Sequence, residues 1–123
     1  MVESMPLAKA LNAGLRAAMT ADEHVLLMGE DIGKLGGVFR VTEGLQAEFG
    51  DRRVLDTPLA ESGIVGTAIG LAMAGFRPVV EIQFDGFVFP AFDQITTQLA
   101  KLTNRHEGAL AMPIVIRSKQ LIG

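Results

Sequence analysis

The chain has 123 residues, of which 49% are hydrophobic and 20% charged, and its formal net charge is −3. This length suits one domain with a real core, and this composition excludes a disordered chain and a basic nucleic-acid-binding surface. The chain contains no cysteine, which excludes a disulfide framework, a thiolate zinc site and a cysteine nucleophile.

The first residues lack the charged, apolar and small segments of a secretory signal. The most apolar stretch, residues 64–76, is too short to span a bilayer and contains three glycines. We therefore expect a cytoplasmic protein that contacts neither membrane nor nucleic acid.

The first half of the chain predicts two helices and two strands. Apolar side chains recur at helical spacing over residues 7–20, with Ser4 as the expected N-cap and Pro6 near the first turn. The apolar run at residues 25–28 predicts a buried strand. After a glycine-rich loop, residues 42–49 predict a short helix that Gly50 ends, and residues 54–55 a second brief strand.

The second half repeats this alternation. Residues 62–74 predict a helix that contains three glycines, and residues 78–82 a third buried strand. After the loop FDGFVFP, residues 91–102 predict a regular helix and residues 113–117 a fourth strand. Apolar strands that alternate with helices predict an α/β fold, with one parallel sheet covered by helices on both faces.

Three loops follow the predicted strands, at residues 29–39, 57–61 and 83–90. Ligands of open α/β sheets bind beyond the carboxyl ends of the strands. These loops carry acids, an amide and several phenylalanines, and the polar members are Glu30, Asp31, Glu61, Gln83 and Asp85. The two histidines, His24 and His106, lie in polar contexts away from these loops, so we expect them to be solvated surface residues.

The glycines of the third predicted helix, Gly63, Gly66 and Gly70, form neither a dinucleotide fingerprint nor a phosphate loop. Each lowers helix propensity by up to about 1 kcal/mol. We expect close approach of a neighbouring helix or of a second subunit to compensate.

Glu61 has two interpretations from its position alone. A carboxylate in the first turn of a helix gains about 0.3–1 kcal/mol from the helix dipole, and spacing alone favours this structural role. The alternative is an acid placed to do chemistry.

Longer motifs help to decide between these two roles of Glu61. The runs GEDIGKLGGVFRVTEGLQAEFG, RVLDTPLAESGIVGTAIGLAMAGFRPVVEIQFDGF and FPAFDQITTQLAK occur in this order. In this order they resemble the beta subunit of the thiamine-diphosphate-dependent decarboxylating component of 2-oxo acid dehydrogenase complexes, most closely the branched-chain type. The resemblance covers residues 5–117 and implies the family's transketolase-like pyrimidine-binding domain.

The resemblance implies a set of site residues. Glu61 matches the catalytic glutamate that hydrogen-bonds a pyrimidine ring nitrogen of the cofactor, and so takes part in general acid–base catalysis. Leu59, Gln83 and Phe87 match the pyrimidine pocket, with Phe87 stacking on the ring. Glu30 matches an acid on a buried acidic path between two active sites.

The resemblance also implies partners. Thiamine diphosphate is the expected cofactor, and its diphosphate and magnesium are held by a partner alpha subunit, so this chain is expected to hold no metal. An alpha subunit and a second beta subunit complete a heterotetramer, which docks on the acyltransferase core of the complex. The expected substrate is a branched-chain 2-oxo acid. A pyruvate-type beta subunit and a transketolase-like synthase share the glutamate and stay open as alternatives.

The chain departs from the family after the fourth predicted strand. Residues 118–123 read SKQLIG, where relatives have a proline- and glycine-rich turn and then a catalytic histidine pair. We therefore expect residues 1–123 to form one truncated pyrimidine-binding domain that is inactive by itself. The alternative is a non-enzymatic product that binds no cofactor and exposes an unpaired edge strand.

Overall fold

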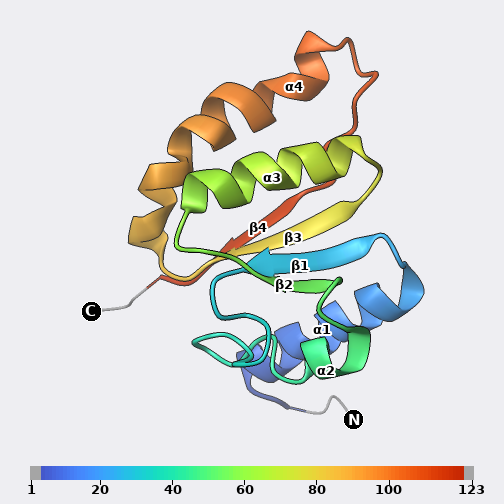
Figure 1. Ribbon diagram of the computed structural model, residues 1–123, viewed down its shortest axis with the longest axis vertical. Coiled ribbons are helices and arrows are strands. Elements are labelled where there is room, and N and C mark those ends of the chain that lie inside the picture. Colours follow the sequence, from blue (N-terminus) through green and yellow to red (C-terminus); the bar gives the residue numbers. More distant parts are fainter. Residues whose placement is uncertain (1–3, 121–123) are drawn as a thin grey trace.

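The computed structural model describes residues 4–120 (Figure 1). Strands and helices alternate along the chain in the order α1 (Leu7–Ala21), β1 (Val25–Gly29), α2 (Leu45–Phe49), β2 (Val54–Asp56), α3 (Glu61–Met73), β3 (Arg77–Ile82), η1 (Asp85–Ala91), η2 (Gln94–Leu99), α4 (Ala100–Arg105) and β4 (Val115–Ser118). This alternation is the one that the apolar runs of the sequence predict.

The four strands form one parallel sheet in the order β2-β1-β3-β4. In the register of the sheet, Val25 pairs with Arg77 and Val79 with Val115. Parallel strands end at the same edge of a sheet, so the loops after β1, β2 and β3 meet there. The predicted α/β class and the parallel sheet are confirmed.

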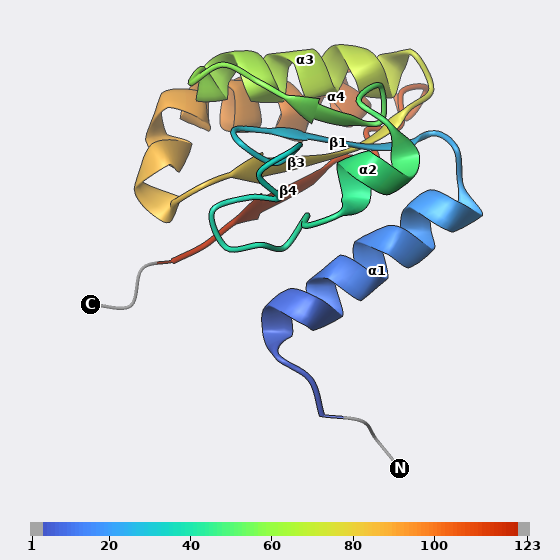
Figure 2. The ribbon, with the colours of Figure 1, turned by 60° about the horizontal axis from the view of Figure 1, so that its bottom comes forward.

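Helices cover both faces of the sheet (Figure 2). Leu27 of β1 packs with Met19 and Leu45 in the core beneath α1 and α2. The next residue, Met28, points to the other face and packs with Ile64 and Ala68 of α3. Successive strand residues point to opposite faces, and because both faces are buried, β1 reads as a continuous apolar run.

The predicted start of the first helix at Leu7 is confirmed, but its predicted cap and the predicted start of the second helix are wrong. The N-cap residue of α1 is Pro6 and no side chain caps the helix, so Ser4 does not have the expected role. The second helix begins at Leu45 rather than at residue 42. Thr42 instead donates its hydroxyl to the carbonyl oxygen of Ile32 at 2.7 Å, and Gly44 has a φ of 79° that a regular helix excludes.

The predicted regular helix over residues 91–102 is also wrong in kind. A helical segment runs from Asp85 to Arg105, first as the 3₁₀ turns of η1, then as the π-type turns of η2, then as α4. Pro90 has no N–H to donate within η1. Thr96 donates its hydroxyl to the carbonyl of Phe92 at 2.9 Å, a bond that competes with regular backbone pairing.

Candidate functional site

The candidate site lies at the carboxyl edge of the sheet, where three connecting segments meet. Glu30 and Asp31 follow β1, and the turn after β2 leads directly into α3. The N–H of Thr57 donates to the carbonyl of Gly29 at 3.0 Å, which fastens the turn to the end of β1. This contact places the acids after β1 beside the start of α3.

Glu61 is the first residue of α3 and is partly buried. The preceding N-cap residue, Ala60, offers no side-chain cap, and its N–H donates to the carbonyl of Pro58 at 2.8 Å. The free N–H groups at the start of a helix carry partial positive charge. Glu61 therefore lies where it can interact with the helix dipole, as its spacing predicts. Because α3 begins just after β2, this position is also at the carboxyl edge of the sheet.

Glu30 is buried next to Glu61, with 3% of its surface exposed. No donor in the described part of the chain reaches either of its carboxyl oxygens. Burial raises the pKa of Glu30 above its ordinary value, and the charges of Glu61 and Asp31 raise this pKa further. Once protonated, Glu30 becomes a donor that can hydrogen-bond the Glu61 carboxylate. The two glutamates thus form an acid pair that can share one proton.

Gln83 joins this pair to the end of β3. Its side chain is buried, and Nε2 donates at 3.4 Å to the carbonyl of Glu30 and at 3.4 Å to Oδ2 of Asp31. The other two residues of the predicted pocket are exposed at the surface, Leu59 by 80% and Phe87 by 45%. The described chain therefore brings Glu30, Glu61 and Gln83 together and leaves Leu59 and Phe87 facing outward.

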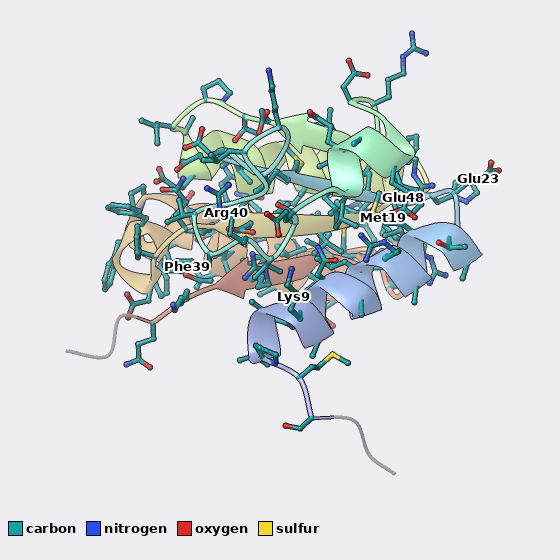
Figure 3. The ribbon with its side chains drawn as sticks, turned by 90° about the horizontal axis from the view of Figure 1, so that it is seen from below. Lys9, Met19, Glu23, Phe39, Arg40 and Glu48 are labelled. Atoms are coloured by element: carbon teal, nitrogen blue, oxygen red, sulfur yellow. The ribbon has the colours of Figure 1, made fainter. Side chains whose placement is uncertain are left out.

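Three aromatic rings line the same edge. Phe84 and Phe87, which follow β3, pack edge to face with their centroids 5.7 Å apart. Phe39, labelled in Figure 3, lies in the loop after β1 and packs edge to face on Phe84 at 5.5 Å. The rings connect two loops that are distant in the sequence.

Sequence reasoning missed the residues that hold the loop after β1. Asp56 accepts a hydrogen bond from the N–H of Gly33 at 2.7 Å. A Cβ on Gly33 would lie 2.4 Å from Oδ2 of Asp56, so a larger residue would have to displace the carboxylate that accepts this bond. The signal was available, because an acid that ends a strand next to a glycine-rich loop is a candidate acceptor for backbone N–H groups.

A second missed feature is a cross-strand ion pair inside the sheet. Glu81 of β3 and Arg117 of β4 are register partners, and their side chains form a salt bridge with 7% and 18% of their surfaces exposed. Burial lowers the pKa of Arg117. One charged residue of opposite sign in each of two apolar runs, PVVEI and PIVIR, was the signal for this pairing.

A hollow of about 320 Å³ opens between β2 and α3, lined mainly by apolar side chains such as Leu55, Pro58 and Ile64. The hydroxyl of Thr57 lies at this hollow, buried and without a partner among the described residues. Residues of the turn before Glu61 and of α3 line this hollow, but Glu61 itself does not.

The glycines of α3 do not pack as expected within the chain. A Cβ on Gly70 would meet no atom within 4 Å, and one on Gly63 would meet only the Cβ of Ala60 at 3.6 Å. Gly66 faces the Gln94 side chain at 3.6 Å. A neighbouring helix of the same chain therefore explains Gly66 at most, and contact with a second subunit stays a prediction for the others.

The histidines lie away from the site. His24 is exposed at the opposite end of the sheet, with its Nδ1 atom 3.0 Å from Asp22, and His106 is exposed just after α4. Within residues 4–120, no three or more His, Asp or Glu side chains gather in a way that could hold a metal ion. In the same residues, no helix is long and apolar enough to cross a membrane.

The curated relatives of the chain reported next are beta subunits of dehydrogenases, and each is about three times as long as this chain. The chain is 76% identical over 116 residues to the pyruvate dehydrogenase E1 component subunit beta of Leifsonia xyli. It is 56% identical over 115 residues to the 3-methyl-2-oxobutanoate dehydrogenase subunit beta of Mycobacterium tuberculosis, and 55% over 114 to the pyruvate dehydrogenase E1 component subunit beta of Staphylococcus epidermidis. These matches cover 93–94% of this chain and 33–35% of the relatives, so the chain spans about a third of their length.

The family comparison agrees with the fold. The description "Transketolase, pyrimidine binding domain" matches residues 3–116, nearly all of the chain. A parallel sheet with helices on both faces is consistent with this match. The chain belongs to the transketolase pyrimidine-binding domain family.

Proposed function

We propose that this chain supplies the pyrimidine-binding half of a thiamine diphosphate site, in the beta subunit of the decarboxylating component of a 2-oxo acid dehydrogenase. The observation that carries the proposal is the position of Glu61, at the start of α3 and against the buried acid Glu30. The names of the relatives support the enzyme class, because both pyruvate and 3-methyl-2-oxobutanoate are 2-oxo acids.

The side chains fit an aminopyrimidine. Such a ring has nitrogen atoms that hydrogen-bond a carboxyl group at its edge and flat apolar faces that stack on aromatic side chains. Glu61 provides the carboxyl group, and the half-exposed ring of Phe87 provides a stacking face. The buried Glu30, whose oxygens receive no hydrogen bond from the described residues, supports the same site, because it reserves a proton for Glu61.

Thiamine diphosphate, when bound, supplies the electron sink that decarboxylation of a 2-oxo acid requires. Glu61 would hold or release a proton at the pyrimidine nitrogen. Glu30 would donate its proton to the far oxygen of Glu61, and so keep the other oxygen free for the ring. Gln83 would orient Glu30 and Asp31 through its amide, and Leu59 with Phe87 would exclude water from the ring.

The site needs a second chain. Large apolar side chains are exposed around it, with Leu59 at 80%, Phe89 at 77% and Phe92 at 54%. We propose that an alpha subunit covers this edge and holds the diphosphate and its magnesium. A second beta subunit would complete the heterotetramer, which would dock on the acyltransferase core in the cytoplasm.

Pyruvate is the substrate that the comparisons favour. The identity is 76% to a pyruvate dehydrogenase subunit and 56% to a branched-chain one. The branched-chain preference expected from the sequence is not confirmed. We propose pyruvate, and assays with pyruvate and 3-methyl-2-oxobutanoate side by side decide between the two.

The test of the proposal is Glu61→Gln in the full-length chain assembled with its alpha subunit. Glutamine keeps the size of the side chain but cannot exchange a proton, so we expect decarboxylation to fall about 100- to 10,000-fold. The matched control is Glu23→Gln, an exposed glutamate just before β1, which should leave turnover unchanged. Near-normal turnover in Glu61→Gln would overturn the catalytic role.

A calorimetric titration tests the need for a second chain. Thiamine diphosphate with magnesium is added to this chain alone and to the chain with the alpha subunit. We expect heat of binding only with both chains present. Tight binding by this chain alone would contradict the shared site, and no binding in either sample would favour the non-enzymatic product.

A further inference from the structure

The ring of Phe87 is held from one side. It lies on the rim of the site, 45% exposed, near the start of η1. Its aromatic contact is with Phe84, at a centroid distance of 5.7 Å and an interplanar angle of 81°. A ring in this position needs a fixed neighbour to keep one orientation.

Phe84 is itself held by Phe39. The two rings pack edge to face, with centroids 5.5 Å apart and planes at 84°. On Phe39, the ammonium group of Lys119 lies 3.6 Å from the ring centroid. Phe39 therefore contacts both a cation and an aromatic ring, and both are favourable partners for its ring.

The loop that carries Phe39 is closed by hydrogen bonds within it, and the N–H of Gly33 ties it to Asp56 of β2. Figure 3 shows Phe39 on this loop. The N–H of Gly37 donates to the carbonyl of Asp31 at 2.8 Å. The buried Thr42 donates its hydroxyl to the carbonyl of Ile32 at 2.7 Å. Phe39 is thus the end of the aromatic row that the backbone holds in place, and Phe87 is the end that faces outward.

We propose that Phe39 is a positioning residue for Phe87, and that it acts through Phe84. Phe39, Phe84 and Phe87 form a row of edge-to-face rings that transmits the fixed position of the loop after β1 to the ring on the rim. This inference rests on the proposed stacking of Phe87 on the pyrimidine of thiamine diphosphate. It adds a residue from a different loop to the determinants of cofactor affinity.

The first test measures the mobility of the rim residue without any cofactor. The chain has no tryptophan or tyrosine, so Phe87→Trp introduces a single fluorophore. Adding Phe39→Leu, which keeps an apolar side chain but removes the ring, should increase acrylamide quenching and lower the fluorescence anisotropy. Phe76→Leu is the matched control, because Phe76 packs on His24 at the opposite end of the sheet. Equal quenching with and without Phe39→Leu would overturn the proposal.

The second test is a double-mutant cycle on thiamine diphosphate affinity, in the full-length chain assembled with its alpha subunit. Phe39→Leu should weaken binding about two- to ten-fold, the range of one aromatic pair, and Phe39→Tyr should restore it. In the background of Phe87→Ala, the same Phe39→Leu change should have no further effect. Effects that multiply independently would overturn the proposal.

The two proposals fail in different ways. If Phe87→Ala leaves thiamine diphosphate affinity unchanged, the proposed cofactor site is wrong. If Phe87→Ala weakens binding but Phe39→Leu does not, only the positioning role of Phe39 is wrong. Thermal unfolding of each variant shows whether a loss of affinity follows from a loss of structure.

Discussion

The two ends of the parallel sheet differ in whether their polar groups are paired by hydrogen bonds. At the amino ends of the strands, the guanidinium of Arg53 donates to the carbonyls of Met19, Asp22 and Val25 at 2.7–3.1 Å. The carboxylate of Asp22 accepts hydrogen bonds from the backbone N–H of His24, at 2.8 Å, and lies 3.4 Å from Nε of Arg77. At the carboxyl ends, the buried Glu30 lies beside two further acids and receives no hydrogen bond from the described residues.

This difference assigns stability to one end of the sheet and the proposed chemistry to the other. Buried polar groups in folded proteins are nearly always paired, so the unpaired carboxyl group of Glu30 lowers stability. A buried acid with a raised pKa at a ligand-binding edge is a candidate for function. The amino end therefore stabilises the domain, and the carboxyl end tolerates an unfavourable group for the reaction we propose.

Removing Arg53 should give the largest loss of stability. Arg53→Met keeps the apolar stem and removes all of its hydrogen bonds to the three carbonyls. We expect the free energy of unfolding to fall by about 2–4 kcal/mol, because hydrogen bonds to a charged group contribute about 1.5–3 kcal/mol each and water partly replaces them. Urea denaturation measures this change.

The matched control for Arg53 is the neighbouring Arg52, which is exposed. Arg52→Met should change the free energy of unfolding by less than about 0.5 kcal/mol. Equal effects of the two substitutions would mean that the amino end is not the stabilising end, and the comparison would fail.

Glu30→Gln should give a smaller change of the opposite sign. The raised pKa of Glu30 means that the folded chain binds this proton more tightly than the unfolded chain. Stability from this group is therefore full below the ordinary glutamate pKa of 4.5 and is lost as pH rises through the raised folded-state pKa. Glutamine does not titrate, and we expect it to stabilise the domain by about 1–3 kcal/mol at pH 8.

The measurement is thermal unfolding of both proteins from pH 4 to pH 8. The melting temperature of the parent chain should fall toward pH 8 relative to that of Glu30→Gln, and the two should converge at low pH. Parallel melting curves across this range would contradict a buried, proton-holding Glu30.

Asp22→Asn should give the smallest effect, again with the opposite dependence on pH. Hydrogen bonds from the backbone N–H and the side chain of His24 lower the pKa of Asp22, and Arg77 adds to this. A lowered pKa contributes stability above the ordinary value of 3.8, which is lost as pH falls through the folded-state pKa. The melting temperature should therefore drop slightly at pH 7 and not at all near pH 2, and a larger loss at low pH would reverse the assignment.

The sequence predicted the frame of the fold because buried parallel strands have a plain signal. The run at residues 25–28 is wholly apolar, the run at residues 78–82 is apolar apart from Glu81, and both form strands at the centre of the sheet. The starts of helices were harder, since Thr42 uses its hydroxyl to close the loop instead of capping a helix. The mixed turns of η1 and η2 depend on competition between backbone and side-chain bonds, which spacing does not reveal.

In the candidate site too, some features could be predicted from the sequence and others could not. Strand order puts Glu30, Glu61 and Gln83 at one edge, and this follows from the parallel α/β pattern once the loops are known. The close approach of Glu30 to Glu61 required the turn at Thr57 to be fastened to Gly29. Their roles, and those of Leu59 and Phe87, came from the family resemblance and stay predictions.

The order of the strands also sets how the domain can fold. β1 lies between β2 and β3, and Val25 must find Arg77 across the whole of α2, β2 and α3. Contacts between residues so far apart in the sequence close large loops before they gain any stability, which slows folding. On the ribosome, β1 can pair with β2 alone until β3 has emerged, so one edge of this apolar strand stays open to chaperones during synthesis.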